Sequence, residues 1–241
     1  MSADMNAAVD AASIRENLAT VQSGIQGALA RAGRDPAEVT LIAVSKTFPV
    51  EAMQVLYDEG VRDFGESYVQ EWLDKRDRLP DDIRWHLIGG LQSNKCKMLG
   101  EDVAMIHAVD RKSLIKELQK HSVAVRSVLL QVRLGGEASK SGVDPDGLLG
   151  LLEATTQRDR MCVEGLMAIP PPTEDEEQAR AYFHELSELR WRCVEWLQKD
   201  RMLDQHPMWH LSMGMSSDYE VAVEEGATLV RVGSALFGSR S

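Results

Sequence analysis

Two short apolar segments of this chain carry side chains that can do chemistry. Lys46 ends the segment Leu41-Ile42-Ala43-Val44-Ser45-Lys46, and Arg231 lies within Leu229-Val230-Arg231-Val232-Gly233. A lysine at the inner end of a buried strand is desolvated, which lowers the pKa of its amine and raises the fraction of free amine. A free amine is the nucleophile that attacks a carbonyl group. Taken alone, the first segment equally allows the Lys46 amine to point into solvent.

Two loops rich in glycine and serine offer ligands for an anion. The candidates are Ser212, Gly214 and Ser216 in the first loop and Gly233 and Ser234 in the second. The first loop precedes a predicted helix at Asp218, whose free backbone amides and dipole favour an anion. Turn geometry and helix capping explain either loop alone. Both loops beside Lys46 favour a phosphate site, so the pattern suits a phosphate-bearing aldehyde.

Eight predicted strands alternate with helical patterns and position these residues. They are Thr40–Lys46, Arg62–Glu66, Arg84–Ile88, Met105–Val109, Ser127–Leu134, Val163–Ile169, Trp209–Met213 and Leu229–Val232. An additional helix, Ala11–Arg31, precedes the first strand and ends at Gly33. The alternation predicts an α/β protein with a parallel sheet, and we favour a single (β/α)8 TIM barrel over a doubly wound sheet. Closure of that barrel makes the first and last strands neighbours.

Several helix boundaries have sequence signals. The pattern Thr173-x-x-Glu176 predicts a capping box that opens a helix at Glu174–Lys199, and Ser217-x-x-Glu220 predicts another that opens a shorter helix. Gly60 and Gly226 are expected to end helices.

Composition limits the range of functions. The 241 residues suit one domain, 1–241, with residues 1–10 expected to be a flexible N-terminus. A net charge of −11 disfavours nucleic acid or an anionic membrane as a partner. Three scattered cysteines, Cys96, Cys162 and Cys193, indicate free thiols. The sequence shows no signal-peptide pattern and no run of roughly 18 apolar residues, so it predicts a cytoplasmic protein. We expect the protein to be monomeric.

Other motif classes are weak. His206 and His210 have the spacing of zinc ligands, but Pro207 interrupts the helix that would align them, so we expect no metal and a structural His210. Gly214-Met215-Ser216 resembles half of a nucleophile elbow, yet Asp218 stands where the second glycine belongs. No Walker A loop or dinucleotide-binding loop is present.

Motifs along nearly the whole chain match one family. They include Ala43-Val44-Ser45-Lys46-Thr47, Phe64-Gly65-Glu66-Ser67-Tyr68-Val69-Gln70-Glu71, Trp85-His86-Leu87-Ile88-Gly89, Leu91-Gln92-Ser93-Asn94-Lys95, Ser139-Lys140-Ser141-Gly142, Gly165-Leu166-Met167-Ala168-Ile169-Pro170, Leu211-Ser212-Met213-Gly214-Met215-Ser216 and Val230-Arg231-Val232-Gly233. From about Ile14 to Arg240, the chain resembles the pyridoxal 5′-phosphate (PLP) homeostasis proteins. These proteins share the barrel of the N-terminal domain of alanine racemase.

The resemblance implies roles for individual residues. It implies a PLP Schiff base at Lys46 and an Arg231 side chain that faces the pyridine nitrogen. It further implies that the loop 212–216, with Ser212, Gly214 and Ser216, holds phosphate together with Gly233 and Ser234. His86 and Met167 are expected to contact the cofactor. Lys140 is either a solvated loop charge or an acceptor or gate for the cofactor aldehyde.

This chain departs from the family pattern at a few positions. Ser67 and Arg133 stand where asparagine is common, and the Gly89-Gly90 pair has a glycine where proline is common. The first two changes remove planar amides at strand ends, so hydrogen bonds to the cofactor ring or to nearby loops are affected there. The glycine affects loop stiffness more than chemistry.

These features favour a carrier over an enzyme. An arginine partner disfavours a protonated pyridine nitrogen and so weakens PLP as an electron sink. The sequence also ends about eight residues after the last strand, so we expect no second domain that closes the site. We expect a non-catalytic protein that buffers PLP and delivers it, apo PLP-dependent enzymes being candidate partners. The alternatives are an oligomeric PLP-dependent racemase or decarboxylase, and a cofactor-free Schiff-base aldolase.

Overall fold

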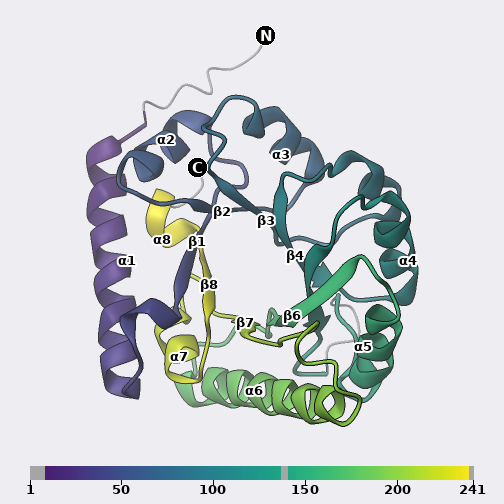
Figure 1. Cartoon of the computed structure of the whole chain (residues 1–241). Helices are drawn as coiled ribbons and strands as arrows, with labels where there is room; N and C mark the ends of the chain where they lie inside the picture. Colours follow the sequence, from purple (N-terminus) through teal and green to yellow (C-terminus); the bar gives the residue numbers. More distant parts are fainter. Residues whose placement is uncertain (1–8, 137–140, 239–241) are drawn as a thin grey trace.

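The chain forms a closed barrel of eight parallel strands. A computed structural model describes residues 9–136 and 141–238, so Lys140 and residues 1–8 of the expected flexible N-terminus lie outside the described residues. The strands follow one another around the ring in chain order (Figure 1). They are β1 (Thr40–Val44), β2 (Asp63–Glu66), β3 (Arg84–Leu87), β4 (Val103–Val109), β5 (Arg126–Val132), β6 (Met161–Ala168), β7 (His210–Ser212) and β8 (Leu229–Val232). The predicted fold class and strand order are confirmed.

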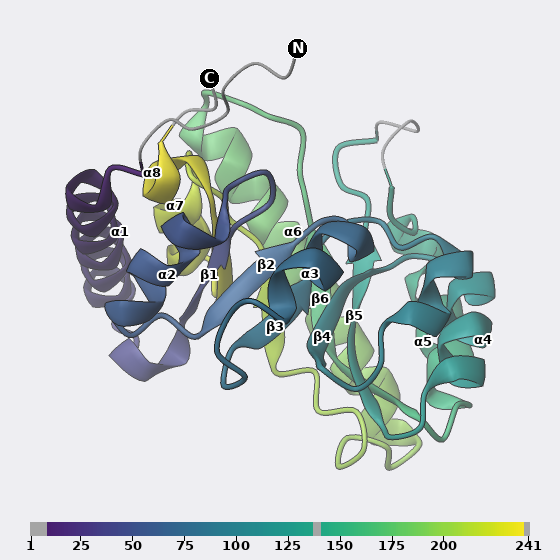
Figure 2. The same ribbon diagram turned by 90° about the horizontal axis from the view of Figure 1, so that it is seen from above.

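Helices cover the outside of the barrel, as Figures 1 and 2 show from two directions. The α-helices are α1 (Ala11–Ala32), α2 (Val50–Asp58), α3 (Val69–Arg76), α4 (Lys112–His121), α5 (Leu148–Thr156), α6 (Glu176–Lys199), α7 (Tyr219–Glu224) and α8 (Ser234–Phe237). Short 3-10 helices are η1 (Pro36–Glu38), η2 (Ser93–Met98) and η3 (Pro145–Gly147). Among the described residues, no helix is long and apolar enough to cross a membrane.

Helix α1 is the additional N-terminal element that the sequence predicts. The side chain of Asp10 accepts a hydrogen bond from the backbone N–H of Ser13 and caps the helix start. Gly33 ends the helix in the left-handed conformation, with φ of 65°. The apolar face of α1 packs against α2, α7 and α8, on the side of the barrel where β1 meets β8 (Figure 1).

Two predicted helix starts are wrong by a few residues. Helix α6 begins at Glu176, and its cap is Asp175, whose carboxylate accepts the backbone N–H of Glu177 at 3.0 Å. Thr173 instead accepts the N–H of Asp175, which places it before the helix. Helix α7 begins at Tyr219 after Asp218, so Ser217 is not its cap. Asp175 thus takes the capping place in α6, whereas Asp218 stands at the start of α7 without a side-chain capping hydrogen bond and instead accepts the N–H of Met215.

The end of β1 differs from the sequence prediction in a way that matters for the site. Strand pairing stops at Val44, and Lys46 lies in a turn closed by a hydrogen bond from Phe48 N–H to Ser45 O, 3.0 Å long. Thr47 has a positive φ of 69°, which no strand accommodates. Lys46 is therefore carried just beyond the strand, above the barrel end.

Gly60 and Gly226 end helices as predicted. Both have positive φ angles, of 94° and 98°, and each follows the last residue of α2 or α7 by two positions. A residue without Cβ adopts this conformation at no steric cost.

Candidate functional site

One cavity of about 540 Å³ opens at the carboxyl end of the barrel strands. Its size falls within the range typical of small-molecule sites. The predicted site residues that line it are Lys46, Ser216, Arg231, Gly233 and Ser234. The remaining lining residues are Val44, Ser67, Tyr68, Ile88, Gly89, Gly90, Ile169, Met215 and Ser217. The structure thus gathers an amine, a guanidinium and two polar loops around one cavity.

Strand register explains why these groups meet. In the β1–β8 pair, Ile42 lies opposite Arg231 and Ala43 lies opposite Val232. The two strands therefore end side by side. Gly233 then approaches β1 so closely that a Cβ on it would lie 3.3 Å from the carbonyl oxygen of Val44. A larger residue at position 233 would push the last loop away from Lys46.

The backbone on both sides of Lys46 is anchored by a cluster of charges formed by the buried Glu66 and Lys75 and the partly buried Glu71. Lys75 Nζ donates to the carbonyl oxygen of Ser45 at 2.8 Å, and it also forms ion pairs with both carboxylates. The Ser45 hydroxyl donates to Glu66 at 2.7 Å, and the N–H of Thr47 donates to Glu71. These contacts fix where the Lys46 side chain leaves the backbone.

Burial raises the pKa of Glu66, although the charge of Lys75 and its hydrogen bond oppose the rise. The second carboxylate oxygen of Glu66 is buried without a hydrogen-bond partner among the described residues. The charge of Lys75 therefore stabilises the ionised carboxylate of Glu66, which its surroundings solvate poorly.

Replacing Lys75 with methionine is expected to lower the free energy of unfolding by about 3 kcal/mol, because it leaves a buried carboxylate uncompensated. Chemical denaturation monitored by circular dichroism measures the change. The matched control is Lys97→Met, which removes an exposed lysine and is expected to change stability by less than about 0.5 kcal/mol. Equal effects of the two substitutions would contradict a role for this cluster of charges.

The two loops of the predicted phosphate site contact each other directly. The Ser216 hydroxyl oxygen accepts the backbone N–H groups of Gly233 at 3.3 Å and of Ala235 at 3.1 Å. The carbonyl oxygen of Gly214 accepts the N–H of Arg231 at 3.0 Å. Two backbone amides thus converge on one oxygen atom, which is the arrangement that a phosphate oxygen requires.

Gly214 is required by this loop geometry. Its φ is 87°, and a Cβ at this position would lie 2.6 Å from the Cβ of Ala222 on α7. Only glycine allows the loop to lie so close to the helix.

Arg231 is buried at the floor of the cavity with a fixed guanidinium. Its Nη1 donates to the Ser212 hydroxyl at 2.6 Å and its Nη2 donates to the carbonyl oxygen of Ala168 at 2.9 Å. Burial lowers the pKa of Arg231 to about 10, against the opposing charge of Asp218. The guanidinium is therefore still charged at neutral pH, and it presents only hydrogen-bond donors to the cavity.

Among the predicted site residues that the structure describes, four do not line the cavity: Ser212, Gly214, Met167 and His86. Ser212 is buried behind Arg231, and Met167 is fully buried in an apolar cluster. Both ring nitrogens of His86 are engaged, with Asp63 and His107. Lys140 lies outside the described residues. Ser212 and His86 therefore approach the cavity only through other side chains.

The three positions that depart from the family pattern lie in different surroundings. Ser67 lines the cavity. Arg133 forms an ion pair with Asp144, 2.5 Å long. Gly89 touches the loop after β2, because a Cβ on it would lie 2.4 Å from the carbonyl oxygen of Ser67.

The histidines with zinc-like spacing have structural contacts, as expected for His210. His206 accepts the backbone N–H of Val163 at 3.1 Å, and His210 contacts the Thr228 hydroxyl at 3.1 Å. Within residues 9–136 and 141–238, no group of three or more histidine, cysteine or acidic side chains could hold a metal ion. All three cysteines belong to this part of the chain and are free thiols.

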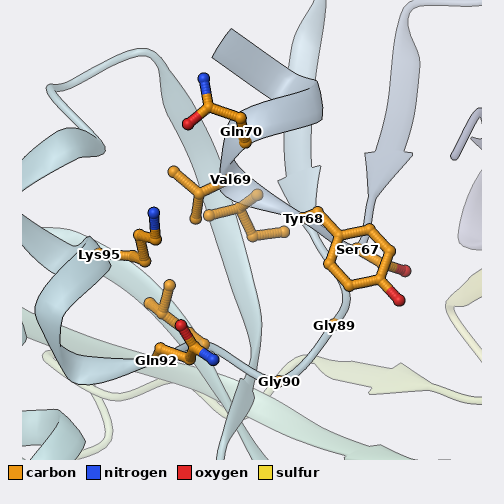
Figure 3. Close-up of a pocket in the computed structure, with 10 residues that line it drawn as sticks. Ser67, Tyr68, Val69, Gln70, Gly89, Gly90, Gln92 and Lys95 are labelled. Atoms are coloured by element: carbon orange, nitrogen blue, oxygen red, sulfur yellow. The ribbon is translucent and has the colours of Figure 1, made fainter.

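A second, smaller cavity of about 200 Å³ adjoins the first. The two share Ser67, Tyr68, Gly89 and Gly90. Figure 3 shows Lys95 and Gln92 on one side of the smaller cavity and Val69 and Gln70 of α3 on the other. Tyr68, one of the shared residues, is 65% exposed, and Figure 3 shows its ring beside Ser67.

Comparison with known proteins identifies the class to which this barrel belongs. The family model for the N-terminal domain of alanine racemase matches residues 9–241. The chain therefore belongs to the alanine racemase N-terminal domain family. Alanine racemase from Corynebacterium glutamicum shares the fold, with a TM-score of 0.70 at 15% identity over 96% of this chain and 62% of that chain.

Closer relatives carry a more specific name. Proteins named pyridoxal phosphate homeostasis protein from Aquifex aeolicus and Pseudomonas aeruginosa are each 45% identical to this chain. The alignments cover 93% of this chain and 97% of the Aquifex protein, and 94% and 96% for the Pseudomonas protein. PipY of Synechococcus elongatus, solved with PLP bound, superposes with a TM-score of 0.79 at 36% identity, covering 93% of this chain and all (100%) of PipY.

Proposed function

We propose that this protein binds PLP at the barrel mouth, holds it through Lys46, and carries it without acting as an enzyme. The observation that carries the proposal is that Lys46, Arg231, Gly233 and Ser216 line the same cavity. The names of the relatives and the PLP in PipY support it. We extend the proposal to one PLP-binding domain, 1–241, that works as a monomer in the cytoplasm, where free thiols stay reduced.

Each part of the cavity suits one part of PLP. When bound, PLP supplies an aldehyde that an amine holds reversibly as a Schiff base. The Lys46 amine would be that partner, and the buried Arg231 would donate toward the pyridine nitrogen. The phosphate would be held by Gly214, Ser216, Gly233 and Ser234. The donors are the serine hydroxyls and the backbone N–H groups of Gly233 and Ala235, which contact the Ser216 hydroxyl in this structure.

The same residues favour carriage over catalysis. Arg231 has no acceptor atom, so it cannot receive a hydrogen bond from a protonated pyridine nitrogen. Beside bound PLP, Arg231 would therefore disfavour a proton on the pyridine nitrogen, which would weaken the electron sink that racemases and decarboxylases need. The rim of the cavity is open as well, since Tyr68 is 65% and Ile169 39% exposed. Water reaches such a site, which disfavours carbanion chemistry. The same opening gives an incoming amine or an apo PLP-dependent enzyme access to the cofactor.

The test is to titrate the purified protein with PLP, reduce it with borohydride and map the modified peptide. We expect one PLP per chain, yellow colour that borohydride bleaches, and added mass on Lys46. Incubation of the loaded protein with each L-amino acid is expected to give no sustained formation of D-enantiomer or amine. Sustained turnover would instead establish a racemase or decarboxylase. A Schiff base with a phosphorylated sugar in the absence of PLP would establish an aldolase.

A further inference from the structure

A continuous chain of hydrogen bonds runs through the interior of the barrel and ends at Arg231. Its members are Asp63 on β2, His86 on β3, His107 on β4, Ser212 on β7 and Arg231 on β8. All five are buried, and the least buried is 6% exposed. We call them the interior chain. Polar side chains are costly in such a place unless each finds a partner, so the contacts among them need an explanation.

The contacts are short and consecutive. His86 Nε2 lies 3.0 Å from Asp63 Oδ1, and His86 Nδ1 lies 3.0 Å from His107 Nε2. His107 Nδ1 lies 2.8 Å from the Ser212 hydroxyl, which accepts from Arg231 at 2.6 Å. Both nitrogens of each histidine are therefore used.

The link between His107 and Ser212 crosses the barrel. Strands β4 and β7 are separated by β5 and β6 in the ring, so this hydrogen bond joins opposite parts of the sheet (Figure 1). Strand β4 has an irregular register at this point: Ile106 pairs with Val128 and Val109 with Leu130, which leaves one extra residue on β4. Such bulges re-aim side chains.

The ends of the interior chain determine where its protons lie. Although burial opposes ionisation, hydrogen bonds from Arg84 and His86 lower the pKa of Asp63, so this carboxylate only accepts. At the other end Arg231 only donates. Burial also lowers the pKa of His107 well below its usual value, which keeps the ring neutral.

With Asp63 accepting at one end and Arg231 donating at the other, one placement of the protons uses every donor and acceptor in the interior chain. Arg231 donates to Ser212, and Ser212 donates to Nδ1 of His107. His107 then donates from Nε2 to His86, and His86 donates from Nε2 to Asp63. Both histidines carry their proton on Nε2 in this arrangement. A proton on Nδ1 of His107 would instead make Ser212 accept twice and leave its own hydroxyl proton without a partner in the chain.

We propose that Asp63, His86 and His107 are positioning residues for Arg231. They hold the Ser212 hydroxyl turned toward His107, so that its oxygen faces the guanidinium and fixes the orientation of Arg231 at the cavity floor. The inference rests on the proposed function, in which Arg231 meets the pyridine nitrogen. Because Asp63, His86 and His107 do not line the cavity, any effect they have on PLP travels through Ser212 and Arg231.

The proton positions are testable in the protein without PLP. Long-range proton–nitrogen NMR spectra of the nitrogen-15-labelled chain report which ring nitrogen of each histidine carries the proton. At neutral pH we expect His86 and His107 both to be protonated on Nε2 alone. A proton on Nδ1 of His107, or a doubly protonated His86, would overturn the proposal. This result is independent of whether PLP binds at Lys46.

A pair of substitutions at the far end tests transmission to PLP. Asp63→Asn keeps an oxygen that accepts from His86, whereas Asp63→Leu removes it. We expect Asp63→Leu to weaken PLP binding about fivefold, which corresponds to one hydrogen bond, and to leave His86 without a preferred protonated nitrogen. We expect Asp63→Asn to retain affinity within about twofold, since the hydrogen bond persists. Asp82→Leu removes an exposed carboxylate and is the matched control.

The outcomes separate this proposal from the proposed function. If Asp63→Leu binds PLP as tightly as the parent and its His107 spectrum is unchanged, the positioning role is overturned. The proposed function is unaffected by that result as long as borohydride still fixes PLP on Lys46. If Asp63→Leu fails to fold, His107→Asn serves instead. Its amide oxygen takes the place of Nδ1 and accepts from Ser212, so we expect affinity within about twofold of the parent and an about fivefold loss in His107→Phe. Equal affinities of these two variants would contradict the proposal.

Discussion

Replacing Lys46 with alanine is expected to abolish the borohydride-stable attachment of PLP at the barrel mouth. The reason is that Lys46 is the predicted amine that the structure places in the cavity with Arg231 and the two serine-glycine loops. Noncovalent binding through Arg231 and the phosphate loops is expected to persist, at an affinity lower by at least about tenfold, or about 1.4 kcal/mol. Mass spectrometry of the reduced protein measures the attachment, and equilibrium dialysis measures the affinity.

The control is Lys95→Ala, which removes the lysine of the adjoining cavity (Figure 3). This variant is expected to keep one reducible PLP per chain on Lys46. Full covalent occupancy in Lys46→Ala would contradict the assignment and would place the bond on another lysine. Lys140 is the first position to map in that case, and Lys95 is the next.

Gly165→Ala is expected to be the most destabilising single substitution in the sheet, with a loss of about 3 kcal/mol or more in the free energy of unfolding. Gly165 pairs with His210 across β6 and β7, and a Cβ on it would lie 1.9 Å from the His210 carbonyl oxygen. No backbone atom can yield by the distance required without breaking the strand pair. Urea denaturation measures the loss.

Gly150→Ala is the matched control for this prediction. Gly150 lies in helix α5, and a Cβ there would meet no atom within 4 Å. The substitution is expected to stabilise the protein by up to about 1 kcal/mol, because alanine has the higher helix propensity. A Gly165→Ala protein as stable as the parent would show that β6 and β7 are not packed as closely as described.

The sequence was sufficient to predict the barrel and the order of its strands, although β1 ends at Val44 and not at Lys46 as predicted. Short apolar runs between helical patterns located all eight strands, because parallel strands buried on both faces are apolar along their whole length. Closure then placed Lys46 near Arg231 without further information. Local signals were less reliable where two capping residues compete, and Asp175 took the place predicted for Thr173.

The sequence did not predict the contacts made across the barrel. His86 was expected at the cofactor, yet its ring nitrogens face Asp63 and His107, which belong to other strands. The bulge in β4 leaves no recognisable sequence signal, so the inward partners of His107 could not be read in advance. Lys75 was missed although Glu71 precedes it by four residues, since that spacing is typical of ordinary surface pairs.

The anchoring of the Lys46 turn also has a practical use. Glu71 and Lys75 belong to α3, so the turn that carries Lys46 is tied to a helix on the outside of the molecule. A protein that docks on this helix and shifts it would also displace the turn at Lys46, to which the proposed function attaches PLP. The colour of the bound vitamin would then report, in real time, on an encounter that takes place at a distance from it.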